Sequence, residues 1–195
     1  KKALRYRSYW RDRGGITVSG GEPLLQIDFL IELFELAKKE GVHTVIDTCG
    51  QPFTREGAFF SKLQRLLAST DLVLLDIKHI DDEQHRLLTG WGNENILDFA
   101  RYLSEIGKPV WIRHVLVPSR NDSDEYLSRL DAFVKPLRNV ERFEVLPYHT
   151  LGVYKWKELG LDYPLEGIDP PGQALIDHAN AMLHTAEYQK FRENN

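Results

Sequence analysis

The sequence predicts an α/β fold in which about five βα units build a parallel sheet. Short runs rich in apolar and β-branched residues recur about every 30 residues and are typical of strands. Longer segments with apolar residues at helical spacing lie between these runs. Polar and ionisable residues gather where each strand-like run ends. In parallel α/β folds the carboxyl ends of the strands are the edge that binds ligands.

Composition limits the number of domains and the kinds of partner. The 195 residues are 42% hydrophobic and 28% charged, enough apolar material for one domain with a core. We therefore expect residues 1–195 to form a single domain. Lys and Arg number 25 against 29 Asp and Glu, a formal net charge of −4, and the sequence has no basic block. Nucleic acid is therefore not an expected partner.

Cys49 is the only cysteine in the sequence. These residues alone therefore form neither an intrachain disulfide nor a metal site of several cysteines, and a reducing cytoplasm is the expected compartment. The longest apolar runs, such as LVLL at residues 72–75, are too short to span a bilayer, so no membrane partner is expected.

Changes in the spacing of apolar residues predict the first two βα units. Residues 15–19 (GITVS) predict a strand, and residues 24–41 carry apolar residues at helical spacing. Residues 43–50 (HTVIDTCG) predict the second strand and residues 54–69 its helix. Before them, residues 1–15 are charged, aromatic and helix-permissive.

The next two units repeat the pattern. Residues 71–80 predict a strand, and the helical pattern over residues 81–108 is broken near Gly90 to Gly92. Residues 109–118 predict the fourth strand and residues 123–137 its helix.

After the fifth predicted strand, residues 140–149, the order changes. Residues 150–171 are rich in Gly, Pro and aromatic residues and predict an extended segment, and a last helix is predicted over residues 172–189. A disordered tail is the alternative, disfavoured by three aromatic residues that supply apolar area to bury: Tyr154, Trp156 and Tyr163.

The ends of the five predicted strands carry chemically useful groups. They are Gly20, Gly21 and Glu22 after the first strand, Asp47 and Thr48 in the second, Asp76 and Lys78 in the third, Arg113 in the fourth, and Tyr148 and His149 in the fifth. Each also has a structural explanation, such as a helix cap, an ion pair, a solvated charge or a turn hydrogen bond. Capping does not explain Lys78 and Arg113 inside apolar strands, because buried charges are costly unless paired or functional. The joint placement favours one ligand-binding edge.

This set of groups suits a zwitterionic ligand. Backbone carbonyls beside the two glycines and the Glu22 carboxylate can accept from an ammonium group, and Lys78 can face a carboxylate. Asp47 and Asp76 can hold a small cation through oxygen ligands. SGGEP is neither a phosphate loop nor a dinucleotide fingerprint, and no nucleophile with an adjacent base stands out, so no catalytic residue is assigned.

Several motifs together carry a family resemblance. They are GGITVSGGEPLLQ, HTVIDTCG, LVLLDIKHIDDEQHRLLTG, VWIRHVLVP and VERFEVLPYHTLGVYKW. In this order and spacing the chain resembles the radical S-adenosylmethionine (SAM) activases of glycyl-radical enzymes, in particular the family that activates pyruvate formate-lyase. The resemblance implies an oxidoreductase with a partial (β/α)6 barrel and a [4Fe-4S] cluster held by a CxxxCxxC loop after its first strand. SAM chelates the cluster, and its reductive cleavage gives a 5′-deoxyadenosyl radical that takes a hydrogen atom from a glycine of the partner.

The resemblance also implies roles for individual residues. SAM is contacted by Gly20, Gly21, Glu22, Asp47, Thr48, Asp76, Lys78 and His149. A monovalent cation is bound by Asp47, Thr48, Leu74 and Asp76. Arg113 resembles a residue that grips the glycyl-radical loop of pyruvate formate-lyase. A flavodoxin-like electron donor and a monomeric state are also implied.

The sequence departs from the family in one respect, because it has no CxxxCxxC motif. Cys49 lies in a DTxG turn and is interpreted as a small structural side chain, so the cluster ligands are absent from these residues. The expectation is a chain that lacks the first strand and the cluster loop and is inactive as it stands. A homologue that has lost the chemistry, a non-catalytic SAM-fold binding module and an activase of a different glycyl-radical enzyme are the alternatives.

Overall fold

The computed structural model describes residues 2–10 and 14–189, so part of the helix-permissive opening segment, at residues 1 and 11–13, lies outside the described residues. The chain divides into two compact units, each described by itself below. The first unit comprises residues 2–10, 14–76, 95–111 and 138–140, and the second comprises residues 77–94, 112–137 and 141–189.

Five strands form one sheet in the order β1-β2-β3-β4-β5, which confirms the predicted α/β fold. They are β1 (Gly15–Val18), β2 (His43–Thr48), β3 (Leu72–Asp76), β4 (Val110–Leu116) and β5 (Val140–Pro147). β2 pairs in parallel with both β1 and β3. Sequential neighbours in a parallel sheet are what consecutive βα units produce.

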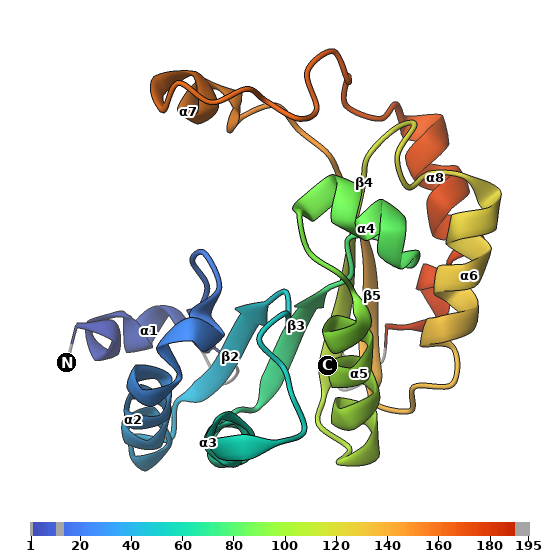
Figure 1. The fold of residues 1–195 in the computed structure, drawn as a ribbon. Helices are drawn as coiled ribbons and strands as arrows, with labels where there is room; N and C mark the ends of the chain where they lie inside the picture. Colours follow the sequence, from blue (N-terminus) through green and yellow to red (C-terminus); the bar gives the residue numbers. More distant parts are fainter. Residues whose placement is uncertain (1, 11–13, 190–195) are drawn as a thin grey trace. The chain divides into compact units, whose positions relative to one another are not determined.

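The helices of the first unit cover its strands with apolar side chains. They are η1 (Ala3–Tyr6), α1 (Arg7–Trp10), η2 (Pro23–Gln26), α2 (Ile27–Lys39), α3 (Gly57–Ala68) and α5 (Glu94–Glu105). α2 and α3 pack against each other (Figure 1). Phe34 of α2 and Leu63 of α3 are fully buried, and Phe53 stacks on Phe99 of α5 with ring centroids 5.0 Å apart. The predicted helix at residues 24–41 thus begins with a 3-10 turn at Pro23.

The second unit contains α4 (Asp82–Thr89), α6 (Asp124–Val134), α7 (Val153–Glu158), α8 (Gln173–Met182) and η3 (Thr185–Glu187). α6 and α8 lie side by side (Figure 1). α4 ends at Gly90, whose φ of 83° is a left-handed conformation that favours glycine, and this confirms the predicted break in the helical pattern.

Three expectations for the last part of the chain were wrong. The segment at residues 150–171 is not extended throughout, because α7 forms within it. The last helix ends at Met182 rather than near residue 189, since His184 adopts a left-handed conformation with a φ of 47°. Tyr154 is 57% exposed rather than buried. Within residues 2–10 and 14–189, no helix has the length and apolar character to cross a membrane.

Candidate functional site

The turn after β1 combines an open backbone with a helix cap. Gly20 has a φ of 143°, outside the range that side-chain-bearing residues favour, and a Cβ atom at Gly20 or Gly21 would meet no atom within 4 Å. The backbone here is therefore open to a ligand. Glu22 is the N-cap of η2, because its Oε1 accepts from the Leu24 amide at 2.9 Å, and Pro23 follows it. The capping interpretation of Glu22 is confirmed.

The Glu22 carboxylate also binds the end of β2. Thr48 Oγ1 donates to Oε1 at 2.6 Å, and the Cys49 amide and Sγ both donate to Oε2 at 3.0 Å. Thr48 is only 2% exposed. Four donors thus converge on one carboxylate and join two loops that lie 26 residues apart in the sequence. We call Glu22, Thr48 and Cys49 the carboxylate clamp.

Cys49 is a hydrogen-bond donor in this clamp. Burial and the hydrogen bond to Glu22 raise the pKa of its thiol to about 11, so the sulfur keeps its proton at neutral pH. The negative charge of Asp76 acts in the same direction. The arrangement agrees with the interpretation of Cys49 as a structural side chain.

The packing below the clamp fixes its position. Gly50 follows Cys49 with a φ of 72°, and a Cβ atom there would lie 2.9 Å from Phe99 Cδ1 and 3.0 Å from Leu75 Cδ1. Thr48 Oγ1 accepts from the Gly50 amide at 2.9 Å. The turn therefore rests on the buried core of the first unit.

The predicted cation ligands lie on adjacent strands of the first unit. Asp47 is the register partner of Leu74, and Thr48 is the partner of Leu75. Asp47, Leu74 and Asp76 are half-buried and alternate with buried neighbours along β2 and β3. Because strand side chains alternate between faces, these three share the less buried face of the sheet. The carboxylate oxygens of Asp47 and Asp76 have the hard-donor chemistry that small cations require, whereas the alternation turns the Thr48 side chain to the opposite, buried face.

The other predicted residues belong to the second unit. Lys78 is half-buried, and its carbonyl oxygen accepts from Asn121 Nδ2 at 2.9 Å. Arg113 is half-buried in β4, where its carbonyl oxygen accepts from the Ile77 amide at 2.9 Å. His149 is exposed after β5. Lys78 and Arg113 thus lie on neighbouring backbone segments of this unit.

Tyr148, immediately before His149, is buried and closes a turn of the second unit. Its hydroxyl lies 2.7 Å from that of Tyr163, and burial together with this contact raises the pKa of Tyr163 to about 12. Tyr163 therefore ties the segment after β5 to the strand end, as its aromatic character suggested.

Three buried histidines of the second unit escaped the sequence-based site prediction. His114 alternates with Arg113 in β4, and its Nδ1 donates to the Ile77 carbonyl at 2.9 Å. Burial lowers the pKa of His114 to about 4, and burial also lowers the pKa of His79 and His85. Within the described ranges, Nε2 of His85 and of His114 has no hydrogen-bond partner. The alternation of side chains along β4 could have indicated that His114 is buried. Neighbouring strand residues point to opposite faces, so His114 points away from Arg113.

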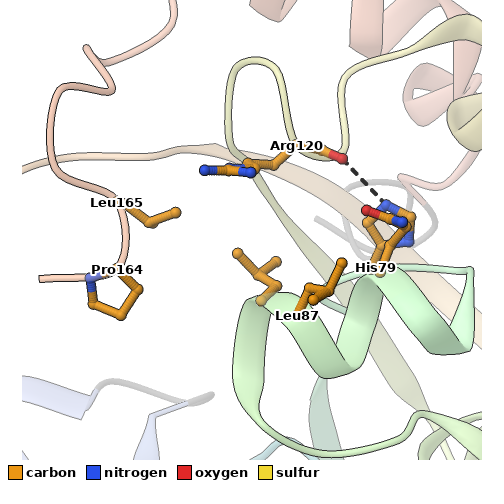
Figure 2. Close-up of a pocket in the computed structure, with 7 residues that line it drawn as sticks. His79, Leu87, Arg120, Pro164 and Leu165 are labelled. Atoms are coloured by element: carbon orange, nitrogen blue, oxygen red, sulfur yellow. Dashed lines mark hydrogen bonds between the residues drawn. The ribbon is translucent and has the colours of Figure 1, made fainter.

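A pocket of about 170 Å³ lies within the second unit (Figure 2). Its walls are His79, Gln84, Leu87, Leu88, Arg120, Pro164 and Leu165. His79 Nδ1 accepts from the Asp81 amide at 3.0 Å, so the ring proton is on Nε2, which donates to the Arg120 carbonyl at 3.2 Å. Figure 2 shows the side chain of Arg120 extending toward Leu165 while its carbonyl oxygen faces His79. The pocket is smaller than the ~300 to 1,000 Å³ of sites that enclose a whole cofactor-sized ligand.

Comparison with known proteins gives consistent matches. A family model described as the Radical SAM superfamily matches residues 1–130. The pyruvate formate-lyase-activating enzyme of Streptococcus mutans is 55% identical over 193 residues, which cover 99% of this chain and 73% of that protein. The enzyme of the same name from Listeria monocytogenes is 53% identical over 189 residues, covering 96% of this chain and 76% of that protein.

Solved structures share the fold. A domain of the pyruvate-formate lyase-activating enzyme from Bacteroides vulgatus has a TM-score of 0.71 at 24% identity, covering 90% of this chain and 96% of that one. Streptococcus suis SuiB bound to S-adenosylmethionine has a TM-score of 0.66 at 20% identity, covering 98% of this chain and 39% of that one.

Proposed function

The chain belongs to the pyruvate formate-lyase-activating enzymes of the radical SAM superfamily, and we propose that it forms the SAM-binding and substrate-binding walls of such an enzyme. Its activity is the SAM-dependent activation of pyruvate formate-lyase, an oxidoreductase reaction. One observation supports the location of the site most directly. The open backbone at Gly20 and Gly21 lies directly beside the carboxylate clamp, at the carboxyl end of parallel strands.

SAM fits the groups that line this edge. Carbonyl oxygens at Gly20 and Gly21 are open to an ammonium group, and Asp47 and Asp76 add negative charge on the less buried face of the sheet. The whole proposed set is Gly20, Gly21, Glu22, Asp47, Thr48, Asp76, Lys78 and His149. When bound, SAM supplies the group that removes a hydrogen atom from a glycine of pyruvate formate-lyase.

The [4Fe-4S] cluster that the family uses does not fit these 195 residues. They contain one cysteine, whose thiol donates to Glu22. Within the described part of the chain, no three His, Cys, Asp or Glu side chains come together as a metal site. We therefore propose that ligands outside these residues hold the cluster.

A monovalent cation is the second proposed ligand of the first unit. Asp47, Thr48, Leu74 and Asp76 would hold it, since the first and third of these are register partners and all four offer oxygen atoms. The cation would offset the charge of two carboxylates close to the SAM amino group.

Arg113 is proposed to hold the glycine-bearing loop of pyruvate formate-lyase. It is half-buried in β4, where a guanidinium can donate several hydrogen bonds to the carbonyl groups of an extended peptide. We further propose a flavodoxin-like electron donor, a monomeric protein, a single-domain barrel and a cytoplasmic location.

A non-catalytic SAM-fold binding module is the second candidate function, because the single cysteine cannot hold a cluster. An activase of another glycyl-radical enzyme is a variant of the first. Anaerobic reconstitution of the natural full-length protein with iron and sulfide separates them. SAM cleavage and activation of pyruvate formate-lyase support the enzyme, whereas SAM binding without cleavage supports the module.

The site assignment has its own test. We expect Asp76→Ala and Lys78→Ala in the full-length protein to weaken SAM binding about tenfold or more, because each removes a charge complementary to the ligand. Lys39→Ala, at an exposed position of α2, is the matched control and should leave the affinity unchanged. SAM dissociation constants measured by equilibrium dialysis decide the matter, and unchanged affinity in both site variants would reject the assignment.

A further inference from the structure

The structure assigns Glu22 a positioning role in which its carboxylate acts on the ligand site through Thr48 and Cys49 rather than by touching the ligand. This inference rests on the proposed SAM site and deepens it. The sequence predicted that the Glu22 carboxylate accepts hydrogen bonds from the ammonium group of the ligand. The observed hydrogen bonds give it a different use.

The carboxylate of Glu22 is occupied by its own chain. An ionised carboxylate offers about four lone-pair sites, two on each oxygen. Leu24 N and Thr48 Oγ1 donate to Oε1 at 2.9 and 2.6 Å, and Cys49 N and Sγ donate to Oε2, both at 3.0 Å. An ammonium group could bind there only by displacing one of these donors.

Thr48 is one of the two residues through which the clamp acts. Its hydroxyl proton is committed to Glu22, and one of its two lone pairs accepts from the Gly50 amide at 2.9 Å. One lone pair therefore remains, and the oxygen can act toward a third group only as an acceptor. A cation or an N–H donor is the kind of partner that such an oxygen can bind.

A simple helix cap does not account for this arrangement. Capping η2 uses only the Leu24 amide, and a shorter acceptor such as Asp or Ser would suffice for it. The other three hydrogen bonds go to residues 26 and 27 positions away, at the end of β2. The additional methylene of Glu allows one side chain to reach both loops.

The buried state of the clamp makes it sensitive to small changes. Thr48 is 2% exposed, so water does not readily replace a lost partner. Glu22→Gln replaces one acceptor oxygen with an NH2 donor, which cannot accept from the Cys49 amide or thiol. Glu22→Asp keeps the charge and the potential to cap η2 but is too short to bridge both loops.

The test uses the natural full-length protein and four variants: Glu22→Gln, Glu22→Asp, Thr48→Val and the double variant Glu22→Gln/Thr48→Val. Glu56→Gln is the matched control, because Glu56 is the exposed N-cap residue of α3 and makes no side-chain cap bond. SAM dissociation constants are measured over a series of K⁺ concentrations. Amide hydrogen exchange of Cys49 and Gly50 is measured without SAM, with Val73 in the buried sheet as the reference for folding.

We expect both Glu22 variants to speed exchange at Cys49 about tenfold and to weaken SAM binding about tenfold, with a loss of the K⁺ response. Glu56→Gln should match the wild type. Because part of the action of Glu22 passes through the Thr48 hydroxyl and part through Cys49, the loss of SAM affinity in the double variant should be clearly less than the sum of the two single losses.

Other results overturn the inference. Additive losses in the double variant would show that Glu22 does not act through the Thr48 hydroxyl. Wild-type SAM affinity in both Glu22 variants would show that the clamp does not serve the site. Exchange at Cys49 that does not change in either Glu22 variant would show that the clamp is absent in solution. Failure of the wild-type protein to bind SAM would instead refute the proposed function, while the exchange measurement still tests the clamp.

Discussion

The carboxylate clamp of the first unit and the buried histidines of the second unit differ in how completely their polar atoms are hydrogen-bonded. Glu22 is half-buried and collects four donors of its own chain. His79, His85 and His114 are each at most 2% exposed, and two of them keep a ring nitrogen without a partner within the described part of the chain. We therefore expect the stability of the clamp region to depend on backbone geometry and packing. The stability of the histidine region should depend on the protonation of its rings.

The largest expected effect is on stability and concerns Asn121, a buried residue of the second unit. Like Glu22, it is hydrogen-bonded by its own chain. Asn121 is 1% exposed, accepts from the Val117 amide at 2.7 Å, and donates to the carbonyls of Lys78 and Val115 at 2.9 and 2.8 Å. Asn121→Leu preserves the volume but leaves these three backbone groups unpaired. We expect the free energy of unfolding in urea to fall by about 4 kcal/mol.

A matched substitution in the first unit provides the control for Asn121. Asn95 is exposed and donates only to the Gln51 carbonyl at 3.1 Å, so Asn95→Leu should cost about 1 kcal/mol or less. Equal losses in the two variants would show that Asn121 does not hold the strand ends together.

Acid should destabilise the second unit through His114. Its pKa is about 6.5 in an unfolded chain and about 4 when folded, because burial disfavours the charged ring. The unfolded state therefore binds the proton first, and stability is lost as the pH falls from about 6.5 toward 4, by about 3 kcal/mol in all. The lowered pKa values of His79 and His85 act in the same direction.

Urea unfolding at a series of pH values between 7 and 4 measures this loss. His114→Leu should flatten the pH dependence, although it lowers stability at pH 7 by leaving the Ile77 carbonyl unpaired. Gln64→Leu, at an exposed and non-titrating position of α3, is the control and should leave the slope as it is in the wild type. A slope that His114→Leu does not alter would contradict a neutral, buried His114.

Next to the clamp, backbone conformation and packing should determine how much a substitution lowers stability. Gly50→Ala combines a left-handed φ of 72° with contacts of 2.9 and 3.0 Å to Phe99 and Leu75, so we expect a loss of about 2 to 3 kcal/mol. Gly57→Ala has nearly the same φ, 73°, but meets no atom within 4 Å, and should cost only about 1 kcal/mol. The difference between the two melting temperatures isolates the packing under the clamp. Equal shifts would show that the turn can move away from the core.

The sequence was sufficient to predict features that depend on local pattern. Apolar periodicity located all five strands, and the break at Gly90 followed from glycine chemistry. Glu22 was recognisable as a cap because Pro23 follows it.

Features that depend on distant segments could not be predicted in the same way. The bonds from Thr48 and Cys49 to Glu22 require two loops to meet, and no local pattern specifies that meeting. α7 formed where Gly and aromatic residues suggested an extended segment, since propensity is a weak guide in short segments. The neutrality of His114 depends on its burial in the folded chain, which no short pattern reports directly.

The smallest expected effect concerns charges that lie outside both regions. Arg55 donates to Asp98 at 2.9 Å and to Glu105 at 2.7 Å, and these hydrogen bonds raise the pKa of Arg55. All three side chains are between 37% and 54% exposed, so water and salt screen the interaction. Arg55→Gln should therefore lower the melting temperature less than Gly57→Ala does, and the change should disappear in about 0.5 M salt. Arg138→Gln, at another exposed position of the first unit, controls for the change in net charge. A larger loss that persists in salt would mean that contact of Arg55 with the Tyr102 ring, 5.4 Å from its centroid, carries the stabilisation, and that packing rather than charge governs this surface too.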